Sequence, residues 1–371
     1  MSTTIFMMGV SPVTLDDLSS GYNIDWNISV DPRFNAMMGF DETEVREMFH
    51  YYQQNDMLNG DVEAMIAEMK PWYDNYCFAR KSLDDDRVFN CDMTLYYLRW
   101  QVDFHRAPEE MVDKNIRTDY SKLKMLARID RDSVQEGDRM STIEKIAAEG
   151  DIFVDLHTSF PAERITDIDN FRSLLYYYGL LTMCGTRGDL IKMSIPNNCV
   201  REQYFGFLRD YYQKYSSIDL HYLNVMLTDM AYDGRWKPFF ESVAQAYREN
   251  SAVRDAMEGE RNLQGFLKAY LALASYYLVE PELEMNYGYC DFFLLPDKKR
   301  YPDVKHSYIL ELKYATRTAT DAELEVQALE GRNQLLQYSE DKIVRCLSEG
   351  TTLHRLLLQF RGWDLVRCEE V

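Results

Sequence analysis

Several common functional motifs are missing from this chain of 371 residues. It has no Gly-x-x-x-x-Gly-Lys-(Ser/Thr) loop to hold nucleotide phosphates, so we do not expect the chain alone to hydrolyse ATP. Its six histidines form no His-x-x-His or His-Glu-x-x-His pattern, and no Gly-x-Ser-x-Gly motif predicts a nucleophilic hydrolase. No apolar run reaches the roughly 18 residues of a membrane-spanning helix, and the first residues do not resemble a secretory leader.

Paired cysteines and an excess of basic residues are missing as well. The seven cysteines are scattered and never form Cys-x-x-Cys, which predicts reduced thiols in a cytoplasmic protein and argues against structural zinc. The chain holds 41 Lys and Arg against 61 Asp and Glu, a net charge of −20. Proteins that grip long stretches of DNA are usually basic, so this charge argues against tight nonspecific DNA binding.

Hydrophobic spacing predicts a mixed α/β chain. Asp41 with Glu44, and Thr320, are expected to cap the helices that follow them. Helices are expected at 41–53, 60–70, 171–181, 260–278 and 321–342. Strands are expected at 3–10, between 185 and 195, on both sides of the polar turn at 296–300, and at 353–364, where the strand ends in a glycine turn. The segment 11–38 is expected to be irregular. The order helix, strand, strand, helix, strand after 260 predicts a mixed sheet flanked by helices.

The most informative stretch is the predicted hairpin around the turn at 296–300. Asp291 opens its first strand, and Glu311 and Lys313 lie on its second. Residues two apart on a strand point to the same face, so Glu311 and Lys313 project together. In the simplest register Asp291 lies near Glu311, so two carboxylates and one ammonium group converge.

Such a group of side chains suits a divalent cation and phosphodiester hydrolysis. Mg²⁺ (or Mn²⁺) takes hard oxygen ligands, which Asp291, Glu311 and the carbonyl of Leu312 provide. Cleavage also needs an activated water and neutralisation of the charge that grows on the phosphate, which Lys313 is placed to assist. The alternative is that Glu311 and Lys313 form an ordinary ion pair on a strand surface.

Ordered motifs along the whole chain resemble one family. They begin with Gly-Val-Ser-Pro-Val-Thr-Leu at residue 9 and include Trp-Tyr-Asp-Asn-Tyr-Cys-Phe at residue 72. The full set lies at 9–24, 39–45, 72–78, 88–91, 113–120, 169–182 and 195–204. They resemble the AAA-ATPase-like family, in which an ATPase module is fused to a C-terminal PD-(D/E)XK nuclease-like domain.

This resemblance implies a domain plan. Residues 1–75 would be the C-terminal remnant of an ATPase core, 76–230 a helical lid and linker with a small winged-helix-like element, and 231–371 a restriction-endonuclease-like domain. Family members carry a phosphate-binding loop upstream of the segment at residue 9, which implies that Met1 begins a truncated product. A further alternative is an ATPase completed in trans by a partner chain, in an oligomer or with a partner ATPase.

The resemblance also implies further site residues. Gln334 and Tyr338 match the Gln-x-x-x-Tyr signature of RecB-like nucleases and lie on one helix face, where they would contact the substrate backbone or Lys313. Glu284 and Glu260 are candidates for a further metal carboxylate. In the alternative interpretation, these four residues have accessory or structural roles.

The sequence thus predicts a Mg²⁺-dependent nuclease that acts on nucleic acid, with DNA as the expected substrate and no membrane partner. The alternative is a non-catalytic regulatory or scaffold protein with a degenerate nuclease fold. That alternative is favoured by the acidic charge and the missing phosphate-binding loop.

Overall fold

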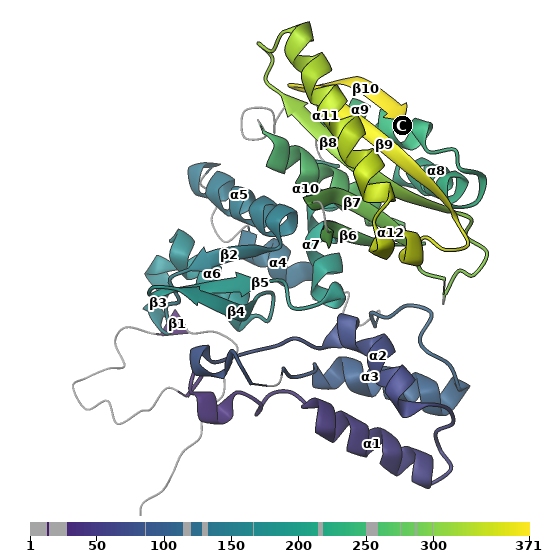
Figure 1. The fold of residues 1–371 in the computed structure, drawn as a ribbon. Coiled ribbons are helices and arrows are strands. Elements are labelled where there is room, and N and C mark those ends of the chain that lie inside the picture. The colour runs from purple at the N-terminus through teal and green to yellow at the C-terminus, as the bar shows by residue number, and fades with distance from the viewer. Residues whose placement is uncertain are drawn as a thin grey trace, which may run out of the picture. The chain divides into compact units, whose positions relative to one another are not determined.

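The computed structural model divides the chain into two compact units, Met1–Phe207 and Leu208–Val371. It describes residues 13–14, 28–85, 87–113, 120–127, 133–165, 167–213, 218–249, 259–274, 276–285, 288–298 and 300–371. Both units contain helices and strands, which confirms the mixed α/β class (Figure 1). The strand predicted at 3–10 lies outside the described residues. The finer division into 1–75, 76–230 and 231–371 stays a prediction.

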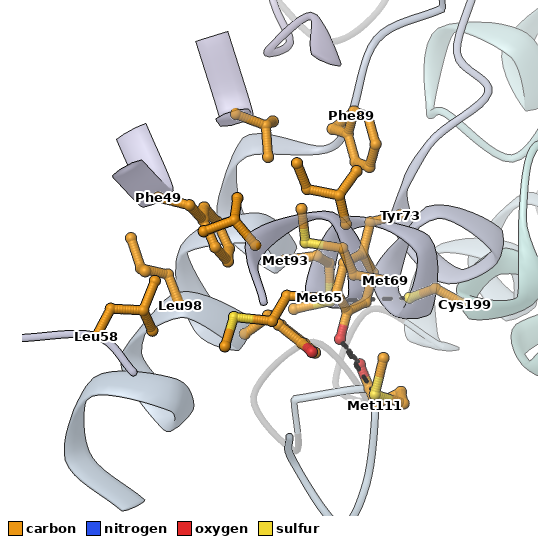
Figure 2. Packing of buried hydrophobic residues seen from close by; sticks show 14 of the residues in the cluster. Phe49, Leu58, Met65, Met69, Tyr73, Phe89, Met93, Leu98, Met111 and Cys199 are labelled. Carbon is orange, nitrogen blue, oxygen red and sulfur yellow. Dashed lines mark hydrogen bonds between the residues drawn. The ribbon is translucent and has the colours of Figure 1, made fainter. Parts of the chain in front are cut away.

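Three helices build the first apolar core of unit 1. They are α1 (Glu42–Gln54), α2 (Val62–Tyr73) and α3 (Cys91–Phe104). As predicted, Asp41 and Glu44 cap α1 with a capping box: the Glu44 N–H donates to Asp41 Oδ1 at 2.8 Å, and the Asp41 N–H donates to Glu44 Oε2 at 3.0 Å. Figure 2 shows Phe49 and several methionines packed in this core. Flexible methionine side chains fill irregular gaps, which suits a core built from short helices.

The remainder of unit 1 combines helices with a small antiparallel sheet. The helices are α4 (Tyr120–Ala127), α5 (Ser133–Glu149), α6 (Ile168–Tyr177) and α7 (Asn198–Tyr212), whose last turn belongs to unit 2. The strands are β2 (Asp151–Val154), β4 (Thr182–Arg187) and β5 (Leu190–Ser194), in the order β2–β5–β4, while β1 (Val13–Thr14) pairs with β3 (Phe160–Pro161). α5, β2, α6 and the β4–β5 hairpin follow one another along the chain, and the winged-helix-like element expected in this region stays a prediction. The helix predicted at 171–181 corresponds to α6, which begins at Ile168 and already ends at Tyr177. The turn and strand predicted at 185–195 correspond to the end of β4 and all of β5.

Unit 2 is a five-stranded sheet with helices on both faces. The helices are α8 (Leu220–Asp233), α9 (Lys237–Glu249), α10 (Glu260–Leu271), α11 (Asp321–Ser339) and α12 (Lys342–Leu347). The strands are β6 (Tyr277–Met285), β7 (Gly288–Pro296), β8 (His306–Ala315), β9 (Thr352–Arg361) and β10 (Asp364–Glu370). The sheet order is β10–β9–β8–β7–β6, and β8 and β9 are the parallel pair. A parallel pair needs a crossover connection, which α11 supplies.

Neighbouring residues of β8 show that α8 and α11 cover opposite faces of this sheet. The Tyr308 hydroxyl donates to the carbonyl of Met230 in α8 at 2.7 Å, whereas Ile309 packs in one apolar cluster with Leu335 of α11. Successive strand side chains point to opposite faces. Glu311 and Lys313 therefore share the face of Ile309, beneath α11 (Figure 1).

Two local predictions in unit 2 are confirmed, the β7–β8 hairpin and the helix cap at Thr320. β7 and β8 form the predicted antiparallel hairpin, although their connection runs from 297 to 305 rather than from 296 to 300. Thr320 caps α11 with a capping box, since the Thr320 N–H donates to Glu323 Oε2 at 2.7 Å and the Glu323 N–H donates to Thr320 Oγ1 at 3.3 Å.

Other predictions in unit 2 were wrong in extent. The helix predicted at 260–278 ends at Leu271, and Leu278 lies in β6, which was not predicted. The helix predicted at 321–342 ends at Ser339 and is followed by the separate α12. β10 was not predicted either. Within the described residues, no helix is long and apolar enough to cross a membrane, and all seven cysteines are free thiols, as predicted.

Candidate functional site

The register of the β7–β8 hairpin places Asp291 beside Glu311. Phe292 pairs with Leu310, so Asp291 and Glu311 are the next residues outward on the two antiparallel strands. The Asp291 carboxylate occupies the place of a further ladder bond, because its Oδ2 accepts from the Leu312 N–H at 2.7 Å. The predicted convergence of Asp291 with the Glu311 end of β8 is therefore present in the structure.

The ammonium group of Lys313 lies beside the carboxylate of Glu311. Its Nζ lies 2.8 Å from Glu311 Oε1, and the side chains of Lys313 and Glu311 are 18% and 5% exposed. The second oxygen, Glu311 Oε2, is buried and has no hydrogen-bond partner among the described residues. A buried carboxylate oxygen without a partner is costly, because folding removes its water without replacing it.

Burial and like charge raise the pKa of both carboxylates. The pKa of Asp291 rises to about 6, chiefly because the group is buried and also because Glu260 is negative. The pKa of Glu311 rises to about 7, again chiefly through burial, and then through the charge of Asp291. Lys313 opposes both increases but does not cancel them. The positive charge of Lys313 is therefore not enough to keep both Asp291 and Glu311 ionised at neutral pH. A divalent cation would supply the additional positive charge.

Helix α10 contributes two further polar side chains, Glu260 and Gln264. Gln264 Nε2 donates to Asp291 Oδ1 at 2.9 Å, a contact that the sequence did not predict. Glu260 is exposed, and its charge raises the pKa of both Asp291 and Glu311. Residues four apart share a helix face, so one face of α10 presents both side chains to the carboxylate pair.

Helix α11 places Gln334 and Tyr338 near the same carboxylates. Gln334 Nε2 lies 3.5 Å from the Tyr338 hydroxyl, and Gln334 Oε1 is buried without a hydrogen-bond partner among the described residues. Burial, followed by the charge of Glu311, raises the pKa of Tyr338 to about 12, so this phenol stays protonated. The predicted pair thus lies on one helix face and within electrostatic range of Glu311, while its catalytic role stays a prediction.

Gly331 allows α11 to approach β8 closely. A Cβ at this position would lie 2.7 Å from Leu357 Cδ1 and 3.3 Å from Lys313 Cε. The first distance is shorter than real Cβ contacts allow, so only glycine fits without a shift. The aliphatic part of Lys313 is therefore packed beneath α11, which limits where its ammonium group can go.

The remaining predicted residues are less well defined. The backbone of Glu284 pairs with Tyr289 in the β6–β7 hairpin, and the Glu284 side chain lies outside the described residues.

In the described part of the chain, no three His, Cys, Asp or Glu side chains are gathered as a metal site. A metal here would therefore bind Asp291 and Glu311, with the Leu312 carbonyl and water completing its shell. Mg²⁺ is commonly held by one or two carboxylates and several waters, so these residues fit it.

All of the site residues described above lie in a part of the chain that matches a known family. Residues 258–370 match the model of the PD-(D/E)XK nuclease superfamily. This part of the chain is a PD-(D/E)XK nuclease-superfamily domain. The PD-(D/E)XK domain includes α10, all five strands of the unit 2 sheet and α11. Its five-stranded mixed sheet is consistent with that fold. No curated protein matches the chain.

Proposed function

We propose that the PD-(D/E)XK domain is a Mg²⁺- or Mn²⁺-dependent nuclease that hydrolyses phosphodiester bonds, with DNA as its substrate. The observation that carries this proposal is the buried group of Asp291, Glu311 and Lys313, in which Glu311 Oε2 has no hydrogen-bond partner among the described residues. Members of the superfamily are generally metal-dependent nucleases, which supports the same conclusion.

Asp291, Glu311 and the Leu312 carbonyl would hold the metal ion. When bound, the ion supplies charge neutralisation at the phosphate and lowers the pKa of a bound water. The two carboxylates would orient it from adjacent strands of the sheet. Burial, followed by like charge, raises their pKa values, and the ion would offset the cost of ionising them. Glu260 and Glu284 are proposed as accessory carboxylates.

Lys313 would act on the water and on the phosphate. Its ammonium group is anchored 2.8 Å from Glu311 Oε1, so it lies beside the proposed metal position. There it can orient the attacking water and stabilise charge on a non-bridging phosphate oxygen. Gln334 and Tyr338 remain donors after Lys313 engages the phosphate, and we propose that they contact the substrate backbone.

We also propose that unit 1 is derived from an AAA-ATPase-like module, whose phosphate-binding loop is not among these 371 residues. The support is the set of motifs from residue 9 to residue 204 and the absence of a Gly-x-x-x-x-Gly-Lys-(Ser/Thr) sequence. The purified chain is then expected to bind no ATP alone. Equilibrium dialysis with ATP tests this, and stoichiometric binding by the chain alone would contradict it.

Metal binding separates a nuclease from a scaffold with a degenerate nuclease fold. Calorimetric titration of Mn²⁺ into the wild-type protein should give a binding isotherm, and Asp291→Asn should weaken it strongly. Asp364→Asn is a suitable control, because Asp364 begins β10 and its side chain is 58% exposed. If the wild type binds no Mn²⁺, or if Asp291→Asn binds it equally well, the proposed metal site is wrong.

A further inference from the structure

Two donors from different elements hold the carboxylate of Asp291. The Leu312 N–H approaches Oδ2 at 2.7 Å from β8, and Gln264 Nε2 approaches Oδ1 at 2.9 Å from α10. Each carboxylate oxygen has two lone-pair positions. One on each oxygen is used by these donors, and no other donor among the described residues takes the second position, which a cation can use.

Without these two hydrogen bonds, the carboxylate of Asp291 would turn away from Glu311 and Glu260. Glu311 and Glu260 both carry negative charge that acts on Asp291. Repulsion between these groups favours rotamers that separate them whenever no cation lies between them. The Leu312 N–H fixes only one oxygen, so a second donor is needed to fix the carboxylate plane.

We propose that Gln264 is a positioning residue that fixes the Asp291 carboxylate in the orientation a divalent metal ion requires. This inference rests on the proposed function of the same site. An amide suits the task because it donates a hydrogen bond without adding positive charge. An ammonium group in its place would compete with the metal for the negative charge of Asp291.

The position of Gln264 on α10 makes its side chain a rigid support. Leu263, Gly265 and Phe266 beside it are buried, and α10 packs against β8. A ligand held by a partner on a packed helix keeps its geometry better than one held from a loop. Partners that orient metal ligands typically change metal affinity or activity 10–100-fold when removed.

Replacement of Gln264 by methionine isolates the hydrogen bond. Gln264→Met keeps the length of the side chain and removes its donor. We expect the Mn²⁺ dissociation constant from calorimetry to increase about 10–100-fold. In DNA cleavage, the half-saturating Mn²⁺ concentration should increase by a similar factor, while kcat at saturating Mn²⁺ should fall less than about tenfold, because the bound metal then fixes Asp291 itself. A purely structural role would lower the melting temperature without changing the Mn²⁺ dissociation constant.

The chain offers a matched control on α9. The amide of Gln245 is exposed and also donates to a carboxylate, that of Glu249. Gln245→Met should leave the Mn²⁺ dissociation constant unchanged. If Gln264→Met does not fold, Gln264→Ala gives the same comparison, since it also removes the donor and adds no charge to the site.

The outcomes distinguish this inference from the proposed function. Weakened Mn²⁺ binding by Gln264→Met or Gln264→Ala, with normal binding by Gln245→Met, supports the positioning role. If the wild type and the Gln264 variants bind Mn²⁺ equally, the positioning role is wrong and the metal site stands. If the wild type binds no Mn²⁺, the proposed function fails and the positioning role fails with it.

Discussion

Replacing Glu311 with glutamine should stabilise the metal-free protein at alkaline pH while removing its activity. Glu311 is a buried acid whose pKa is raised from 4.5 to about 7, chiefly by burial and then by Asp291. Between these pH values the folded protein keeps a proton that the unfolded chain has released. The free energy of unfolding therefore falls as the pH rises through this window, and above pH 7 the full cost of the charge is present.

The size of this cost follows from the pKa increase. About 2.5 pKa units at about 1.4 kcal/mol each correspond to about 3 kcal/mol at pH 8. Glutamine has nearly the same shape, never ionises, and keeps an oxygen that can accept from Lys313. Because Glu311 is only 4% exposed, solvent screening reduces this value little. The pKa of about 7 already includes the attraction and the hydrogen bond of Lys313, so the expected net gain is the same, about 3 kcal/mol.

Urea denaturation in EDTA at pH 8 and at pH 4 measures this gain. At pH 8, Glu311→Gln should be about 3 kcal/mol more stable than the wild type, and at pH 4 the difference should disappear because Glu311 is then protonated in both states. Glu340→Gln is the control, since Glu340 is an exposed acid paired with Arg345 and its replacement should change stability by less than about 0.5 kcal/mol at either pH. A destabilised Glu311→Gln at pH 8, or a difference that does not depend on pH, would refute the argument that burial of this charge is costly.

Three further substitutions test the surroundings of the site and the core of unit 1. Gly331→Ala places a Cβ 2.7 Å from Leu357 Cδ1 and 3.3 Å from Lys313 Cε, so thermal melts should show a loss of about 1–3 kcal/mol and DNA cleavage should fall further than stability alone explains. An unchanged cleavage rate would mean that Lys313 does not depend on the close approach of α11. Thr320→Ala removes the cap of α11 and should lower the free energy of unfolding by about 1 kcal/mol in urea denaturation. Thr320→Ser keeps a capping hydroxyl and should therefore keep most of this stability. Phe49→Ala should cost about 3–5 kcal/mol because Phe49 is fully buried in the core of unit 1, and a loss below 1 kcal/mol would contradict that packing.

The sequence predicted those features that neighbouring residues determine. Thr320 precedes an acid at the capping-box spacing, so the start of α11 was predicted to the residue. The two apolar runs about a polar turn predicted the hairpin, and the expected position of Asp291 near the Glu311 end of β8 is confirmed. The register itself depends on the longer connection at 297–305, which the sequence did not predict. Periodicity of two on β8 then put Lys313 on the same face.

The missed features depend on contacts between distant segments. β6 was not predicted because helical spacing continues from α10 through Leu278, and because Pro281 lowers the strand propensity of this segment. An edge strand tolerates proline, since one side of its backbone needs no ladder partner, but the sequence does not reveal which strand is at the edge. The bond between Gln264 and Asp291 joins residues 27 positions apart and requires the packing of α10 on the sheet, for which the sequence gives no local signal.

The most direct test of the proposed nuclease site is DNA cleavage by the Lys313→Ala variant in Mg²⁺. The wild type should cleave linear or plasmid DNA, EDTA should stop the reaction, and Lys313→Ala should lower the rate at least about 100-fold. Lys342→Ala, at an exposed lysine of α12, should cleave like the wild type. Full activity of Lys313→Ala, or wild-type cleavage that persists in EDTA, would contradict the assignment of Asp291, Glu311 and Lys313 as a metal-dependent active site.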